Sequence, residues 1–378
     1  MNVLINASSS RLGGGQTYLS NLLLHIPERH NLRIYILCDD ALDLPTDREN
    51  IRRIRPRWPT HRPLMRTVWE YLALPDLLRA LDIDVLFSPG GIINGRLPAG
   101  CKSVTMFRNM LPFVPALHAQ YPLGWARLRL WILAKVLLRS LQRADHAIFI
   151  SEYGHRFIEA LTPVPLQRAS VVYHGLSEHF KTAGSNKPDP PTAAAGSEYL
   201  AYVSIFDYYK NQLEVVRAFA LVKQSRPTRE KLLLVGLDDS PYAGEVRREI
   251  RDLELADDVI LTGNISHEAL PGLYAHAKLN LFASDCENCP NIMLEAMGSG
   301  RPLLASAVEP MPEFGAESVL YFDPSDPQNI AAKILEVIDD PVRLRQLGKL
   351  AAERAEGFSW SRATLQTWAA IEAVHRGK

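Results

Sequence analysis

A chain of 378 residues is too long for one ordinary hydrophobic core, and its length predicts two domains. Its 47% hydrophobic and 22% charged residues argue against a disordered or fibrous protein. Its 42 basic and 42 acidic side chains balance each other, which argues against a nucleic-acid partner. The opening MNVLINASSS lacks a cationic leader, no apolar run is long enough to span a membrane, and four cysteines make no disulfide framework. We therefore expect a cytoplasmic protein.

The N-terminal half alternates short apolar runs with longer amphipathic stretches. The runs lie at residues 3–5, 33–37, 84–88, 103–107, 146–151 and 170–173. This alternation is typical of strand-helix-strand units, which build a mostly parallel sheet covered by helices on both faces. The sequence therefore predicts a doubly wound α/β domain in this half.

Residues 181–198 are rich in Pro, Ala, Gly and Ser and poor in large apolar side chains, so we interpret them as an interdomain linker. A second series of apolar runs follows at residues 199–204, 231–236, 258–263, 278–284, 301–306 and 318–322. The sequence therefore predicts two α/β domains in series, 1–182 and 183–360. Ligands of such sheets bind outside the carboxyl ends of the strands.

The loop after the first apolar run contains Gly13, Gly14 and Gly15, which allow a close approach of the backbone to a ligand before a helix. This pattern resembles the start of a dinucleotide-binding fingerprint, although Tyr18 stands where its third glycine belongs. Asp39 or Asp40 could then bind the ribose. An NAD-dependent oxidoreductase is therefore one alternative, and a turn without a ligand is another.

The stretch SDCENCPNIMLEAMGSGRP, residues 284–302, contains a Cys286-x-x-Cys289 pair. A zinc site needs a second pair of ligands nearby, and redox pairs of this spacing open a helix in a small domain. Neither condition is met, so we interpret the cysteines as packing residues of a tight loop.

The same stretch contains Glu287 and Glu295 with seven residues between them. Pro290 suits the first turn of a helix and Gly298 its end, which places Glu287 in a loop and Glu295 inside the helix. The N–H groups of Asn291 and Ile292 would meet an anion between the two acids. Two surface glutamates on an amphipathic helix are the alternative reading.

The run from Glu287 to Glu295 resembles the E-x7-E signature of retaining glycosyltransferases of family 4. The stretches YVSIFDYYKNQLEVVRAFA, VILTGNISHEALPGLYAHAKLNLFAS and EPMPEFGAESVLYFDPSDP resemble the same family in order. So do LGGGQTYLSNLL, VTMFRNMLPFVP, AIFISEYGHRFI and VVYHGLSEHF in the N-terminal half. The resemblance implies the GT-B fold, in which two Rossmann-like domains face each other across a cleft. It also implies that a C-terminal helix, 361–378, rejoins the N-terminal domain.

The resemblance also implies roles for individual residues. Glu295 would bind the nucleotide ribose, Glu287 the transferred sugar and Lys210 the diphosphate. Gly14 and Gly15 would let the acceptor-binding domain close on the donor. The remaining donor-binding residues would be Asn288, Pro290, Asn291 and Ile292. No metal and no cofactor would be needed, because a lysine and helix N-termini can take the charge of the leaving phosphate.

Two positions depart from the family pattern. Ile205 stands where an arginine usually lies beside the diphosphate, so Arg301 or a cation of the other domain would have to substitute. Arg108, followed by Asn109, stands where a histidine often ends the acceptor-side strand. Since arginine is no base at neutral pH, we expect Arg108 and Asn109 to position the sugar or the phosphate.

Two basic stretches contain tryptophan. One contributes Arg53, Arg55, Arg57 and Trp58, and the other a helical face of Arg127, Trp131, Lys135 and Arg139. Such a surface suits either plain solvation or peripheral binding to the inner face of the plasma membrane. A membrane contact would predict a lipid-linked acceptor.

Together these observations predict a retaining, metal-independent glycosyltransferase of surface polysaccharide synthesis, such as O-antigen or lipopolysaccharide. It would move a hexose, mannose from GDP-mannose being our preferred donor, to a lipid-linked or oligosaccharide acceptor. A catalytically inactive binding or scaffold subunit of the same fold is a second hypothesis, and the NAD-dependent oxidoreductase is a third.

Overall fold

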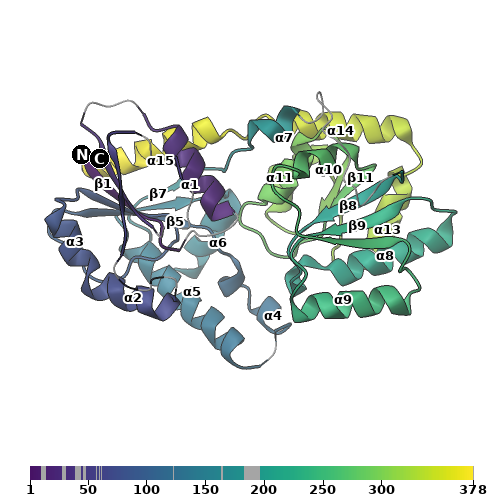
Figure 1. Ribbon diagram of the computed structural model, residues 1–378, viewed down its shortest axis with the longest axis horizontal. Helices are drawn as coiled ribbons and strands as arrows, with labels where there is room; N and C mark the ends of the chain where they lie inside the picture. Colours follow the sequence, from purple (N-terminus) through teal and green to yellow (C-terminus); the bar gives the residue numbers. More distant parts are fainter. Residues whose placement is uncertain are drawn as a thin grey trace. The chain divides into compact units, whose positions relative to one another are not determined.

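The computed structural model describes residues 1–9, 14–27, 31–38, 44–45, 48–56, 58, 60, 62–121, 123–162, 165–182 and 196–377 (Figure 1). The chain forms two compact units. The first contains Met1–Phe113, Gly124–Gly175 and Ser359–Lys378, and the second contains Val114–Leu123 and Leu176–Phe358.

The first unit is built on a seven-stranded parallel sheet with the order β3-β2-β1-β4-β5-β6-β7. Its strands are β1 (Asn2–Asn6), β2 (Arg33–Leu37), β3 (Ile51–Ile54), β4 (Val85–Ser88), β5 (Lys102–Phe107), β6 (His146–Phe149) and β7 (Ala169–Val171). Its helices are α1 (Gly14–Leu24), α2 (Pro63–Leu72), α3 (Leu74–Ala80), η1 (Leu111–Phe113), α5 (Trp125–Arg143), α6 (Glu152–Leu161) and α15 (Trp360–His375). Because the strand order reverses between β1 and β4, the sheet is doubly wound.

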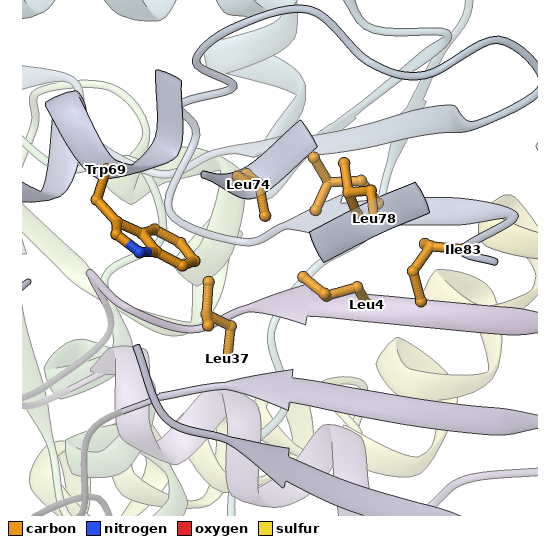
Figure 2. Close-up of a cluster of buried hydrophobic side chains, with 7 residues drawn as sticks. Leu4, Leu37, Trp69, Leu74, Leu78 and Ile83 are labelled. Atoms are coloured by element: carbon orange, nitrogen blue, oxygen red, sulfur yellow. The ribbon is translucent and has the colours of Figure 1, made fainter. Parts of the chain in front are cut away.

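The core of the first unit lies between the central strands and the helices α2 and α3. Leu4 of β1 and Leu37 of β2 pack beneath Trp69, Leu74 and Leu78 of these helices (Figure 2). The helices α1 and α15 cover the opposite face of the sheet (Figure 1). The C-terminal helix α15 contacts α1 and the strands β4, β5 and β6, so the end of the chain belongs to the first unit.

The second unit is built on a six-stranded parallel sheet with the order β10-β9-β8-β11-β12-β13. Its strands are β8 (Tyr199–Val203), β9 (Lys231–Val235), β10 (Val259–Gly263), β11 (Leu279–Phe282), β12 (Leu303–Ser306) and β13 (Leu320–Phe322). Its helices are α4 (Pro115–His118), α7 (Glu178–Thr182), η3 (Tyr208–Lys210), α8 (Gln212–Ser225), α9 (Pro241–Asp252), α10 (Leu270–His276), α11 (Asn291–Gly298), α12 (Met311–Gly315), η4 (Ala316–Ser318), α13 (Pro327–Val337) and α14 (Pro341–Ala355). Here the strand order reverses between β8 and β11.

The two parallel sheets confirm the predicted α/β class, and each predicted apolar run overlaps a strand. The edge strand β3 was missed, because its sequence IRRI has two adjacent arginines between its isoleucines and forms no apolar run. The division between the units also differs from the expected one at 182–183. Helix α7 packs on α11 in the second unit, where Phe180 is buried against Tyr274. Most of the expected linker, 183–195, lies outside the described residues.

Candidate functional site

The carboxyl ends of β8 and β11 carry the candidate site of the second unit. These strands pair in parallel, with Leu281 beside Tyr202, at the point where the strand order reverses. The segment after β8 contains the short helix η3. The segment after β11 leads into α11 (Figure 1). Because parallel strands end at the same edge, two segments far apart in sequence meet here.

Lys210 and Glu287 form an ion pair at this edge. Their side chains are only 6% and 17% exposed, so the pair is largely withdrawn from water. The Lys210 ammonium also faces the ring of Tyr209, 4.8 Å from its centroid, and the Tyr202 hydroxyl donates a hydrogen bond to the Lys210 carbonyl. The lysine is thus held in place, and a ligand anion that reaches it must compete with Glu287.

The loop between β11 and α11 is tight and buried. Asn288 is 3% exposed, and the side chains of Cys286 and Cys289 are buried as free thiols. Burial, followed by the charge of Glu287, raises the pKa of Cys286 to about 12. A thiol of such a pKa carries almost no thiolate at neutral pH, so the loop uses Cys286 for packing. Within the described residues, no group of three or more His, Cys, Asp or Glu side chains is arranged to hold a metal ion.

Helix α11 begins at Asn291 after Pro290, as the sequence predicts. The Asn291 N–H, which the sequence analysis expects to face a ligand, donates a hydrogen bond of 2.9 Å to the Cys289 carbonyl in this structure. Ile292 in the same turn is half-buried. The first turn of α11 is therefore partly closed by its own loop.

Glu295 lies in the middle of α11 and contacts His267, which precedes α10. The distance between His267 Nε2 and Glu295 Oε1 is 3.2 Å, and the Glu295 side chain is 14% exposed. Burial raises the pKa of Glu295, whereas the hydrogen bond with His267 opposes that rise. The same hydrogen bond raises the pKa of His267. The two side chains thus favour each other's charged form.

Tyr121 is a member of the second unit although it comes from the N-terminal half of the chain. Its hydroxyl donates a hydrogen bond of 2.7 Å to Asp207 Oδ1, and its ring contacts Tyr208 edge-on. Burial, followed by the hydrogen bond to Asp207, raises the pKa of Tyr121. Asp207 also accepts a hydrogen bond from the Tyr208 N–H at the start of η3, so Tyr121 supports the segment that holds Lys210.

Arg301 does not join this site, contrary to one sequence-based expectation. It precedes β12 and therefore lies near the amino ends of the strands, opposite Lys210. Its Nε donates a hydrogen bond of 2.7 Å to the Ala277 carbonyl. Ile205, where the family has its arginine, is 51% exposed.

The N-terminal candidates that the structure describes lie in the first unit. Gly14 and Gly15 form the first turn of α1 rather than a loop before it, whereas Gly13, Asp39 and Asp40 lie outside the described residues. Arg108, just after β5, lies 5.5 Å from the ring centroid of Tyr18. Asn109 accepts a hydrogen bond from the Leu111 N–H, which starts η1, so its amide oxygen is used locally.

The predicted basic face of α5 is present in the first unit. Trp131, Lys135 and Arg139 are exposed, Arg127 is half-buried, and the Lys135 ammonium lies 3.7 Å from the Trp131 ring centroid. Large apolar side chains are exposed on the same helix and on α2, a feature that the sequence reading missed. They are Trp125, Leu128, Ile132, Leu64, Val68, Tyr71 and Leu72.

The other basic stretch contributes less to an exposed surface than expected. Arg53 is half-buried on β3 and donates a hydrogen bond of 3.1 Å to the Leu44 carbonyl. Arg55 and Trp58 are exposed, and Arg57 lies outside the described residues.

Two family models match the chain. The model "Glycosyl transferases group 1" matches residues 185–354, and the model "Glycosyltransferase Family 4" matches residues 12–179. Each match falls within one of the two halves, and together they cover most of the chain.

Curated relatives include the O-antigen chain mannosyltransferase B of Escherichia coli, which is 26% identical over 70% of this chain and 69% of its own length. D-inositol 3-phosphate glycosyltransferase of Thermobispora bispora is 29% identical over 62% of this chain. Sulfoquinovosyl transferase SQD2 of Arabidopsis thaliana is 21% identical over 75% of this chain. The matches span 58% of the Thermobispora protein and 55% of the Arabidopsis protein, in each case less than two thirds of that protein's length.

Solved structures of similar fold cover the whole chain. Sucrose-phosphate synthase of Thermosynechococcus elongatus superposes with a TM-score of 0.74 at 20% identity, covering 100% of both chains. Anabaena Alr3699/HepE in complex with UDP and glucose superposes with a TM-score of 0.70 at 17% identity, over 99% of this chain and 100% of its own. At these identities the likeness shows the fold alone.

Proposed function

This chain is a family 4 glycosyltransferase with the GT-B fold, and from that premise we propose that it moves a hexose from a nucleotide-diphosphate sugar to a saccharide acceptor with retention of configuration. The observations that carry the proposal are the Lys210–Glu287 ion pair at the carboxyl ends of β8 and β11, and the largely buried Glu295 on α11, the helix that follows β11. These three residues supply a cation for the diphosphate and two carboxylates for hydroxyl groups.

The proposed reaction replaces one bond at the anomeric carbon of the hexose. The bond from this carbon to the diphosphate oxygen breaks, and a bond to the acceptor oxygen forms on the same face of the ring. The acceptor proton passes to the leaving phosphate. Lys210 stabilises the negative charge on that phosphate, and Glu287, once the diphosphate engages Lys210, is free to bind the sugar.

Mannose is the donor sugar that we propose, with GDP as the nucleotide. The support is that the relatives include O-antigen chain mannosyltransferase B and serotype-specific mannosyltransferase WbdA of Escherichia coli. A solved neighbour binds UDP, so uridine nucleotides are the first alternative to test.

We propose a lipid-linked acceptor and a membrane surface as the partner of α5. The sequence of this helix contains basic and no acidic residues, and its basic side chains stand beside exposed Trp125, Leu128 and Trp131. Basic and aromatic side chains on one exposed helix complement an anionic lipid surface, where the rings enter the interface and the cations meet the headgroups.

A binding subunit without transfer activity is the second candidate. The exposed Ile205 at the arginine position favours it, because one cation for the diphosphate is missing and Arg301 lies at the other end of the sheet. Both family models describe glycosyltransferases, which argues against the NAD-dependent oxidoreductase.

Turnover of a donor panel tests the proposal. The purified chain is incubated with GDP-mannose, UDP-glucose or UDP-galactose and a lipid-linked saccharide, and nucleotide release and the anomeric configuration of the product are measured. We expect the native protein to release GDP from GDP-mannose. Glu295→Ala should lower the rate of release at least about a hundredfold, because a buried hydrogen-bonding partner is removed, whereas Glu353→Ala should leave the rate unchanged.

Glu353 is a suitable control because it is an exposed glutamate on α14. Nucleotide binding without release from any donor would instead establish the binding subunit.

A further inference from the structure

His267 occupies one oxygen of the carboxylate that we assign to the donor ribose. It lies between β10 and α10, and its ring is flanked by two rings of α7, His179 at 5.3 Å and Phe180 at 5.1 Å between centroids. The His267 side chain is 41% exposed, and these edge-on contacts with α7 restrict the orientation of its ring.

We propose that His267 is a positioning residue for nucleotide binding: its imidazole keeps Glu295 ionised and fixes its rotamer, so that the second carboxylate oxygen can accept the ribose hydroxyls. This inference rests on the proposed function, because it assumes that Glu295 binds the ribose. It adds a residue that lies 28 positions before Glu295 and outside the E-x7-E signature.

The charges around the pair support this role. Glu268, next to His267, adds to the rise in the pKa of His267 that the Glu295 hydrogen bond causes. Burial, followed by the charge of His267, lowers the pKa of His179, so His179 stays neutral and does not compete for the carboxylate. Tyr274 of α10 also faces Glu295, and burial keeps its hydroxyl protonated. His267 is thus the cationic partner of Glu295 in this group.

Removal of His267 should change how nucleotide affinity depends on pH. Without the imidazole, the hydrogen bond and the charge that oppose the effect of burial on Glu295 are lost, so the carboxyl takes up a proton at a higher pH than in the native protein. A protonated carboxyl has fewer acceptor sites for a ribose diol. In the native protein the hydrogen bond and the charge of His267 oppose this rise and favour the ionised carboxylate.

Calorimetric titration of GDP, with UDP as a second probe, tests this at several values between about pH 6 and pH 9. We expect His267→Ala to bind about tenfold more weakly than the native protein near pH 6, as the loss of one hydrogen bond to a charged acceptor implies, and to recover most of its affinity near pH 9. His267→Gln, which keeps a donor but no charge, should show the same pH dependence with a smaller loss.

The 2′,3′-dideoxy form of the nucleotide provides a second readout. The native protein should bind it more weakly than GDP, and His267→Ala near pH 6 should discriminate less between the two. His375→Ala, an exposed histidine of the first unit, is the control and should change neither readout.

A loss of affinity that is equal at every pH would overturn the inference, since it would mark His267 as merely structural. Unchanged affinity in both His267 variants would overturn it too. Failure of the native protein to bind either nucleotide would instead reject the proposed function together with this inference, so the two failures are distinguishable.

Discussion

At the scale of single residues, the loop after β11 separates packing residues from ligand-binding ones. Cys286 and Cys289 are buried, and the Cys289 thiol donates to Asn291 Oδ1 at 3.4 Å. We expect the double variant Cys286→Ser/Cys289→Ser to keep most of the donor turnover and to lose about 1–3 kcal/mol of stability, because two hydroxyls replace buried thiols.

Nucleotide release and thermal unfolding of the double variant give these two quantities. In the native protein, a thiol reagent at about pH 8 should leave Cys286 unmodified, since its pKa is raised to about 12. A double variant that is fully folded but inactive would show that the thiols take part in the chemistry.

The residues of the site were predictable where they belong to one local pattern. Glu287, Glu295 and Lys210 were identified from the motif and its resemblance, and the structure brings Lys210 onto Glu287. His267 and Tyr121 were not, because a single sequence contains no signal that joins them to partners 28 and 86 residues away. Such partners become visible only when the order of the strands is known.

At the scale of elements, the carboxyl ends of β8 and β9 approach too closely for a side chain. Gly236 follows β9 with φ +149°, and a Cβ added there would lie 2.0 Å from the Ser204 carbonyl oxygen. We expect Gly236→Ala to destabilise the protein by about 2 kcal/mol or more, because both the backbone conformation and the contact are unfavourable. The midpoint of thermal unfolding measures this loss.

Gly244 is the matched control. It is exposed in α9, and an added Cβ would meet open space. Gly244→Ala should therefore stabilise the protein by about 0.5–1 kcal/mol, since glycine weakens a helix interior. Equal effects of the two substitutions would contradict the close approach at Gly236.

The elements themselves followed from the sequence wherever burial leaves an apolar pattern. Strands buried on both faces are continuous apolar runs, and each of the twelve predicted runs overlaps a strand. The edge strand β3 pairs on one side only, with β2, and its Arg52 is exposed. A strand that is not buried on both faces does not require a continuous apolar sequence. Helix α7 was placed in the wrong unit because five residues carry no information about which sheet they join.

At the scale of the whole molecule, the first unit combines exposed apolar and basic side chains on one face of its sheet. Helices α2 and α5 lie on the same face, opposite α1 and α15 (Figure 1). In the described part of the chain, no helix has both the length and the apolar character that crossing a membrane requires. A contact between α5 and lipid would therefore be made by exposed side chains at the surface of the membrane.

Charge reversal on α5 tests this contact. Lys135 and Arg139 are exposed one turn apart, and each basic residue near an anionic surface contributes about 1 kcal/mol, so Lys135→Glu/Arg139→Glu should weaken vesicle binding at least about tenfold. Cosedimentation with vesicles of phosphatidylglycerol and phosphatidylcholine measures it, with pure phosphatidylcholine as the uncharged reference. The control Arg345→Glu/Lys349→Glu reverses two exposed charges with the same spacing on α14 of the second unit.

Trp125→Ala/Trp131→Ala should weaken binding even at high salt, where charges are screened but apolar burial persists. An equal loss in the α14 control, or equal binding to uncharged vesicles, would remove α5 as the membrane contact.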